Sequence, residues 1–301
     1  MSEVRLAAAG GPLTATFVPE LNMVCSSLRH EGEELLAQRA GLDGYARKGS
    51  TFAIPLLYPW ANRLAGWDFE FGGRRVELAA GELLRPDPDT GLPIHGVAPA
   101  ALAWRIVDRR DDSLEAELAF EEDRLLSVFP FPHRLDLKVS LSAQSLTFRL
   151  TVTPTGSDRV PIAFGFHPYF ELPDADRGDL LLELPVRRSA ILDEHGIPTG
   201  RTEALEADEL DGPVGGRTFD DSFPELDPEP VFAVSGAGRR VAIEYRRGFP
   251  VAQLYVPPDR PFLAIEPMTA PVDSLRSGDG LRSVAPGESF TAEFAVTVAA
   301  L

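Results

Sequence analysis

The stretch RLDLKVSLSAQSLTFRLTV, residues 134–152, decides the fold class of this chain. Apolar and polar residues alternate through its two halves, on either side of a short polar turn. This two-residue period is typical of a β-hairpin with one buried face. The alternation returns at residues 67–78, 104–118, 231–245 and 290–298. We therefore predict an all-β protein of sandwich type, formed by residues 1–301 as a single domain.

Two segments depart from this pattern. Residues 33–47 contain helix-forming side chains but are interrupted by Gly41 and Gly44. Because glycine weakens a helix interior, we expect at most short helical turns there and near residues 272–275. Residues 205–223 are acidic and rich in glycine, which predicts a long surface loop.

The composition limits the classes of partner. The chain carries 46 acidic and 29 basic residues, a formal net charge of −17. This argues against a nucleic-acid partner, which calls for a basic face, and disfavours anionic membranes, although one arginine pocket could still bind a phosphate.

Cys25 is the only cysteine, so no intramolecular disulfide can form. With no signal-peptide pattern and no apolar run of about 20 residues, we expect a cytoplasmic protein without a membrane partner.

The pentapeptide Phe166-His167-Pro168-Tyr169-Phe170 is the most informative candidate site. Pro168 fixes its own φ and biases His167 towards an extended backbone. The flanking aromatic residues offer apolar walls, so a histidine held here suits a pocket that faces a flat ligand such as a sugar ring. The alternative is a satisfied histidine in the core of the sandwich, because intermediate burial is ordinary for this residue type.

Two further motifs lie upstream. Asn62 and Arg63 follow an apolar run and offer a cluster of donors suited to hydroxyl groups, or else form an ordinary capped turn. His95 precedes Gly96, whose missing side chain lets a ligand or another backbone approach closely. Both motifs are candidates for the same ligand site.

Two acidic motifs lie downstream. Asp220 and Asp221 stand in an aromatic segment and could bind neighbouring hydroxyls, although a solvated turn is the simpler interpretation. Glu266 ends an apolar run and precedes a proline. A glutamate is rarely buried without a partner or a chemical task, and burial raises its pKa towards that of a useful base. A structural ion pair is the alternative for Glu266.

Several kinds of chemistry find no support in the motifs. The chain contains no H-E-x-x-H, no C-x-x-C and no close pair of histidines, so we expect no metal. It also lacks a P-loop, a G-x-G-x-x-G fingerprint and a G-x-S-x-G nucleophile elbow. His133 begins a clearly alternating strand, so we interpret it as structural.

Taken together, the motifs resemble the aldose 1-epimerase (galactose mutarotase) family in their order along the chain. The matching segments are Asn62-Arg63, His95-Gly96, Phe166-His167-Pro168-Tyr169-Phe170, Phe219-Asp220-Asp221, Gln253-Leu254-Tyr255 and Glu266-Pro267-Met268-Thr269-Ala270-Pro271. Each motif is weak alone, but six in one order are specific. The resemblance implies a large antiparallel β-supersandwich, no cofactor, and interconversion of the α and β anomers of a free sugar.

The resemblance also implies roles for individual residues. Glu266 matches the general base that takes the proton from the C1 hydroxyl. His167 matches the general acid for the ring oxygen, and His95 matches the second histidine beside it. The positions that bind hydroxyls are matched by Arg63, Asn62, Asp220 and Gln253, with Asp220 favoured over Asp221. We add the hypothesis that Tyr169 or a neighbouring aromatic ring stacks on the sugar.

Three functions remain open at this point. The first is an epimerase of a free aldose. The second is the same reaction on a hexose 6-phosphate, for which Arg246 and Arg247 form a conceivable phosphate-binding pair. The third is a carbohydrate-binding sandwich without catalysis, against which two histidines and a glutamate together argue.

Overall fold

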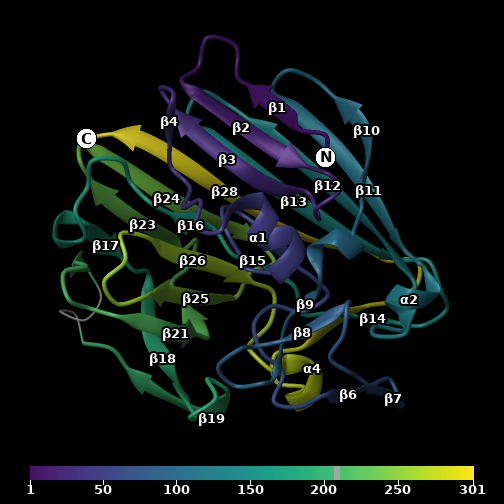
Figure 1. The fold of residues 1–301 in the computed structure, drawn as a ribbon. Coiled ribbons are helices and arrows are strands. Elements are labelled where there is room, and N and C mark those ends of the chain that lie inside the picture. The colour runs from purple at the N-terminus through teal and green to yellow at the C-terminus, as the bar shows by residue number, and fades with distance from the viewer. Residues whose placement is uncertain (207–210) are drawn as a thin grey trace.

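A computed structural model describes residues 1–206 and 211–301 (Figure 1). Among these residues the largest element is a nine-stranded antiparallel sheet. The predicted hairpin of residues 134–152 lies within it, with Leu141 opposite Leu146 at the turn. In spatial order the strands are β10 (Arg105–Arg109), β11 (Ser113–Phe120), β12 (His133–Leu141), β13 (Ser145–Pro154), β28 (Phe290–Ala300), β24 (Arg239–Arg247), β23 (Val231–Gly236), β17 (Leu181–Glu183) and β20 (Gly212–Pro213).

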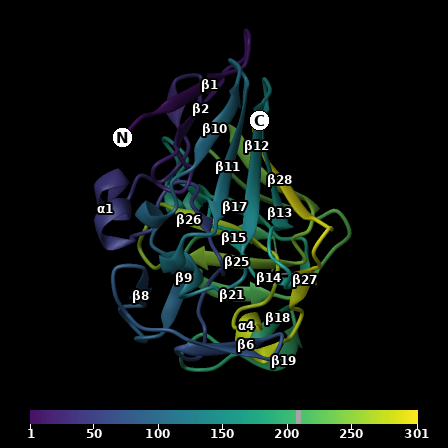
Figure 2. The same cartoon turned by 90° about the vertical axis from the view of Figure 1, so that its right-hand side faces the viewer.

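Two smaller sheets cover this large one. A four-stranded sheet contains β1 (Val4–Ala7), β2 (Leu13–Val18), β3 (Val24–His30) and β4 (Glu33–Glu34). A six-stranded sheet contains β21 (Phe219–Phe223), β25 (Val251–Val256), β26 (Leu263–Met268), β15 (Gly165–Phe166) and β5 (Leu56–Leu57), and β16 (Tyr169–Phe170) also pairs with β26. Figures 1 and 2 show both of them stacked against the long strands of the large sheet.

Aromatic rings join the layers. Phe148 of β13 stacks on Phe294 of β28 within the large sheet, at 4.8 Å between ring centroids. Phe17 of β2 contacts Phe148 at 5.9 Å, and Phe166 of β15 contacts Phe294 at 4.9 Å. Because one face of each sheet is apolar, burying these faces against one another produces the sandwich core. The predicted all-β sandwich class is confirmed.

Short strands and helices surround the sandwich. The paired strands are β6 (Asp68–Phe71) with β7 (Arg74–Glu77), β8 (Leu84–Pro86) with β9 (Pro93–Val97), β14 (Val160–Ile162) with β27 (Arg282–Val284), and β18 (Val186–Leu192) with both β19 (Pro198–Ala204) and β22 (Glu225–Leu226). The helices of the described residues are α1 (Gly41–Lys48), α2 (Asp123–Leu126) and α4 (Ser274–Ser277), with 3₁₀ turns at Pro99–Ala101 and Arg177–Asp179. None of these helices is long and apolar enough to cross a membrane.

Two local predictions need correction. Helix α1 begins at Gly41 and continues through Gly44 for eight residues, because Tyr45 is buried against Phe52 at 5.5 Å and Gly49 closes the helix in a left-handed conformation. Residues 219–223 form strand β21 rather than loop, since they pair along their length with β25. The rest of the predicted loop includes residues 207–210, which lie outside the described residues.

Candidate active site

Strand β26 and the pentapeptide at residues 166–170 bring the proposed base and acid together. Both β15 and β16 pair with β26, and the bend between them carries His167. The Pro168 carbonyl accepts a hydrogen bond from the Ile265 amide, which holds the bend along the strand. His167 Nε2 therefore lies 3.1 Å from Glu266 Oε1, with 6% and 2% of the two side chains exposed.

The Tyr169 hydroxyl also contacts His167. It lies 3.0 Å from His167 Nε2 and 2.7 Å from Thr51 Oγ1. The Tyr169 ring stacks on the imidazole at 4.2 Å, and the guanidinium of Arg39 lies 4.5 Å from its centroid. Because Tyr169 is buried between these groups, the hypothesis that it stacks on a sugar is wrong. Tyr169 orients His167 instead.

His95, on strand β9, lies beside His167. Its ring centroid lies 5.5 Å from that of His167. The backbone here is unusual, because His95 has a φ of 62° and Gly96 a φ of 71°. A Cβ atom on Gly96 would lie 2.1 Å from the Tyr58 carbonyl oxygen, so only glycine permits this close backbone approach. The predicted close approach at Gly96 is thus to backbone.

Asn62 holds His95 and Arg63 through local hydrogen bonds. Its amide N–H donates to His95 Nδ1 at 3.3 Å, and its carbonyl accepts from the His95 amide at 2.9 Å. Its side-chain Oδ1 accepts from the Arg63 amide at 2.8 Å. Since Nδ1 of His95 is an acceptor, the proton of the neutral ring is on Nε2. We therefore assign Asn62 a positioning role in this structure.

Arg63, Asp220 and Gln253 form the polar side of the site. Arg63 Nε donates to Asp87 Oδ2 at 2.5 Å, and its Nη1 lies 3.9 Å from Asp220 Oδ2. Gln253 Nε2 donates to Asp220 Oδ1 at 2.9 Å. Gln253 pairs with Glu266 across strands β25 and β26. This register places an amide, a carboxylate and a guanidinium beside Glu266.

The extended conformation of β21 separates the two aspartates. Successive side chains of a strand point to opposite faces of a sheet. Asp220 reaches Gln253 and Arg63, whereas Asp221 lines a different cavity with Ser189 and Phe219. Asp220 is therefore the aspartate at this site.

Burial shifts the pKa values of Glu266 and His167 in opposite directions. Burial raises the pKa of Glu266 well above its ordinary value, and the charge of Asp220 adds to this effect against that of Arg63. Burial lowers the pKa of His167 well below its ordinary value, with smaller contributions from His95 and Arg39. The pKa of His95 is lowered by burial and then by Arg63. Burial thus favours the uncharged form of each partner, a protonated glutamic acid and a neutral imidazole.

Three residues of this site each have a buried polar atom without a hydrogen-bond partner among the described residues. These atoms are His167 Nδ1, Glu266 Oε2 and Gln253 Oε1. An unpaired buried polar atom costs free energy, so native proteins keep few of them and often for a function. Their gathering beside a histidine–glutamate pair is the arrangement expected for a site that hydrogen-bonds a polar ligand.

Sequence reasoning did not find every contributor to the site. Thr51, Arg39 and Asp87 orient the predicted residues but come from segments with no motif of their own. Within the described residues no cluster of three or more histidine, cysteine, aspartate or glutamate side chains could hold a metal ion.

The chain matches the model of a known protein family. The model for aldose 1-epimerase matches residues 25–297, which is most of the chain. The chain belongs to the aldose 1-epimerase family. All of the site residues above lie inside the matched range, from Arg39 to Glu266.

Two proteins of Escherichia coli K12 are distant relatives in sequence. The chain is 25% identical over 251 residues to the uncharacterized protein YihR of Escherichia coli K12, covering 77% of this chain and 75% of YihR. It is 27% identical over 269 residues to the uncharacterized protein YphB of the same organism, covering 85% and 86%.

Solved structures agree on the fold. A galactose mutarotase-like protein from Clostridium acetobutylicum superposes with a TM-score of 0.85 at 18% identity, covering 99% of this chain and 95% of the other. A galactose 1-epimerase from Lactobacillus acidophilus gives a TM-score of 0.76 at 14% identity, covering 99% and 98%. At these identities the likeness establishes a galactose mutarotase-like fold, as the resemblance of the motifs implied.

Proposed function

We propose that this protein is an aldose 1-epimerase that interconverts the α and β anomers of a reducing monosaccharide. The observation that carries the proposal is the contact of His167 Nε2 with Glu266 Oε1 at 3.1 Å, in a pair whose outer atoms, His167 Nδ1 and Glu266 Oε2, have no partner. A ring that opens and recloses needs a proton removed at one oxygen and delivered at another. A buried acid and base in contact can do both.

In the proposed reaction Glu266 takes the proton from the C1 hydroxyl while protonated His167 delivers one to the ring oxygen O5. The bond between C1 and O5 breaks, and the electrons of the former O1–H bond complete the C1 carbonyl. Rotation about the C1–C2 bond then exposes the other face of the aldehyde. Reclosure returns the proton from O5 to His167 and the proton from Glu266 to O1, so both groups are regenerated.

The opposite pKa shifts suit this exchange. The net effect of ring opening is to move one proton from His167 to Glu266 by way of the sugar. Each unit of pKa difference between the two groups changes the free energy of this transfer by about 1.4 kcal/mol. Because burial raises the pKa of Glu266 and lowers that of His167, it favours the pair with the proton on Glu266 over the ion pair, and ring opening transfers the proton in this direction.

The remaining site residues have supporting roles in this proposal. Neutral His95, with its proton on Nε2, donates a hydrogen bond towards O5. Arg63, Asp220 and Gln253 contact the sugar hydroxyls, and Gln253 Oε1 has a free acceptor site for one of them. A binding protein without catalysis would need no acid–base pair, so the buried His167–Glu266 contact favours an enzyme.

Polarimetry tests the proposal directly. Freshly dissolved α anomers of galactose, glucose and xylose should reach equilibrium faster with the protein than in buffer alone. The Glu266→Gln variant, which retains the shape of the side chain, serves as the control and should leave the spontaneous rate unchanged. Equal rates with wild-type protein and buffer for every sugar tried, charged ones included, would refute the enzymatic role and favour the carbohydrate-binding alternative.

A further inference from the structure

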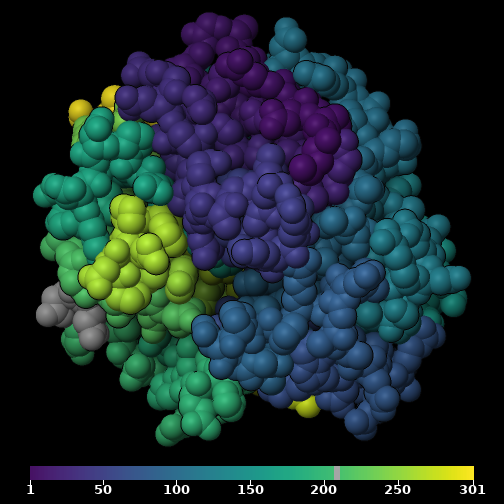
Figure 3. Space-filling view, in the orientation of Figure 1, coloured from purple at the N-terminus to yellow at the C-terminus, as the bar shows by residue number. Residues whose placement is uncertain are grey.

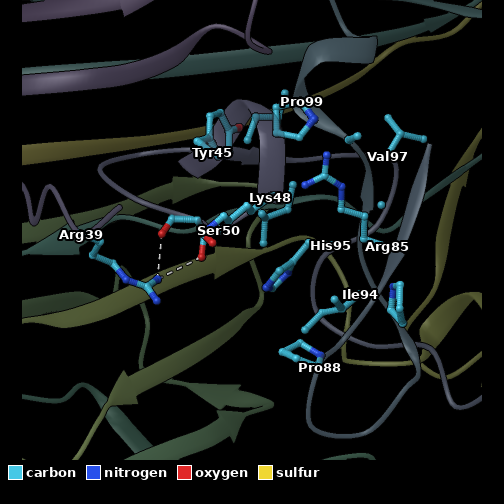
Figure 4. A pocket seen from close by; sticks show the side chains of 17 residues that line it. Arg39, Tyr45, Lys48, Ser50, Arg85, Pro88, Ile94, His95, Val97 and Pro99 are labelled. Carbon is cyan, nitrogen blue, oxygen red and sulfur yellow. Dashed lines mark hydrogen bonds between the residues drawn. The ribbon is translucent and has the colours of Figure 1, made fainter. Parts of the chain in front are cut away.

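A cationic cavity opens beside His95. It encloses about 280 Å³ and is lined by the end of α1, by β8 and β9, and by residues 49–51. Figure 4 shows His95 between Arg39 and Arg85 in this view, with Lys48 also among the lining side chains. The space-filling view shows the surface hollowed where the segments around α1, β8 and β26 meet (Figure 3).

The charge of this cavity is unbalanced. None of the described residues that line it is acidic, although the chain as a whole has a net charge of −17. The neighbouring carboxylates are engaged elsewhere, since Asp43 pairs with Arg47 and Asp87 pairs with Arg63. Within the described part of the chain, Arg39, Lys48 and Arg85 have no ion-pair partner at all.

The fold holds Arg39 in place and leaves room for Arg85. Arg39 donates to the Thr51 carbonyl at 2.8 Å and to Thr51 Oγ1 at 3.2 Å, and its guanidinium lies over the Tyr169 ring. Arg85 lies against Gly49, where a Cβ atom would come within 3.2 Å of the guanidinium. Gly49 has a φ of 67°, so a residue with no side chain both closes α1 and makes room for Arg85.

The cavity adjoins the candidate active site and shares His95 with it. His95 lines the cavity and stacks edge-on to His167, and Thr51 joins the cavity wall to Tyr169. The charge of Arg39 is close enough to lower the pKa of both histidines. In the proposed reaction His95 faces O5. The exocyclic carbon C6 is bonded to C5, the same ring atom that bears O5, so a group on C6 points towards this side of the site.

We propose that the cavity lined by Arg39, Lys48 and Arg85 binds an anionic group on C6 of the sugar, so that the preferred substrate is an acidic aldose. This inference rests on the proposed epimerase function. The shared chemistry is a carboxylate, sulfate or phosphate that accepts charge-assisted hydrogen bonds from guanidinium and ammonium groups. The phosphate-binding pair suggested by the sequence is not part of it, because Arg246 pairs with Glu244 and Glu293 on the large sheet.

The test compares anomerisation rates within one series of sugars. Glucose, glucuronate, glucose 6-sulfate and glucose 6-phosphate are followed by polarimetry at matched ionic strength with the wild type, Lys48→Gln and Arg85→Gln. We expect at least one acidic sugar to exceed glucose in kcat/KM by about tenfold or more, as one charge-assisted contact allows. This ratio should fall about tenfold in each variant. Arg47→Gln, on the same helix and paired with Asp43, is the matched control and should keep the ratio.

The outcomes separate the two proposals. Acceleration of glucose with no preference for any acidic sugar, or a preference that both variants retain, overturns the anionic cavity and leaves the epimerase function standing. If no sugar is accelerated, a thermal-shift titration with the same sugars tests whether the cavity binds an anionic group. Stabilisation of the wild type by an acidic sugar but not by glucose, lost in Arg85→Gln, supports the cavity while the epimerase function fails. No charge-dependent stabilisation overturns both. The sugar that gives the largest effect identifies which anion the cavity prefers.

Discussion

Two buried histidines, His133 and His167, have similar surroundings but differ in their hydrogen-bond partners. Both follow a phenylalanine-rich stretch beside a proline, both contact a tyrosine hydroxyl, and burial lowers the pKa of both. His133 bonds Tyr58 through Nε2 and the Phe131 carbonyl through Nδ1, each at 2.5 Å. His167 shares Nε2 between Tyr169 and Glu266 and leaves Nδ1 unpaired.

The difference separates a structural histidine from a chemical one. His133 has both ring nitrogens satisfied and stacks on Phe120 at 4.8 Å, so it has no capacity left for a ligand. His167 faces a carboxylate and retains an unsatisfied nitrogen. Burial, tyrosine contact and a lowered pKa are common to both residues. A nearby carboxylate and an open hydrogen-bonding site are therefore the observations that indicate catalysis.

Removing the carboxylate is expected to have the largest effect. Glu266→Gln should lower kcat/KM by about 10³-fold, within the range of roughly 10²–10⁴ for a general base. Its melting temperature should stay equal to the wild type or rise, because the amide replaces a buried carboxylate that has an unpaired oxygen. Polarimetry and thermal unfolding measure the two effects. Near-normal rates in this variant would remove Glu266 from the role of base.

The two histidines should respond in opposite ways to one substitution. His167→Gln should lose about 10²-fold in kcat and keep most of its stability. His133→Gln should keep its kcat per folded molecule but lose about 1–3 kcal/mol of unfolding free energy, because the Tyr58 hydroxyl or the Phe131 carbonyl is left without its partner. Urea unfolding with parallel rate measurements checks both. Equal losses of kcat in the two variants would contradict the distinction between a catalytic His167 and a structural His133.

The tyrosine partners offer a smaller, matched comparison. Tyr169→Phe removes the hydroxyl that orients His167, and we expect kcat to fall about tenfold with little change in KM, a loss of the order of one hydrogen bond to a charged group. Tyr58→Phe removes the corresponding hydroxyl at His133 and should change stability but not kcat. A change in KM alone for Tyr169→Phe would contradict the positioning role.

The subtlest prediction concerns pH. The rate should fall as pH decreases, because the Glu266 carboxylate takes up a proton, and the raised pKa places this acid limb above the ordinary value for a glutamate. Burial and the charge of Asp220 both raise this pKa. Asp220→Asn should therefore move the acid limb of kcat to lower pH. Asp221→Asn is the control, since that side chain points to the other face of β21. An acid limb that stays in place in Asp220→Asn would show that Asp220 does not act on Glu266.

Local sequence patterns predicted much of the fold and several candidate site residues. Period-two alternation specified the strands of residues 134–152 and 290–298, because burying one face of a sheet requires it. The same reasoning failed at residues 219–223, where an acidic surface pattern hid a strand. It failed because pairing with β25, a long-range contact, stabilises β21. Helix α1 likewise depends on the burial of Tyr45 rather than on its own propensity.

By itself the sequence determined the all-β class and marked His95, His167 and Glu266 as chemical candidates, because hydrophobic period and residue type are local properties. Only the tertiary structure decided which histidine meets the glutamate, which aspartate joins them, and that Tyr169 orients His167. It alone also brought Arg39, Lys48 and Arg85 to one cavity. Their segments carry no shared pattern, and strand pairing together with packing of the sheets sets the distances between them.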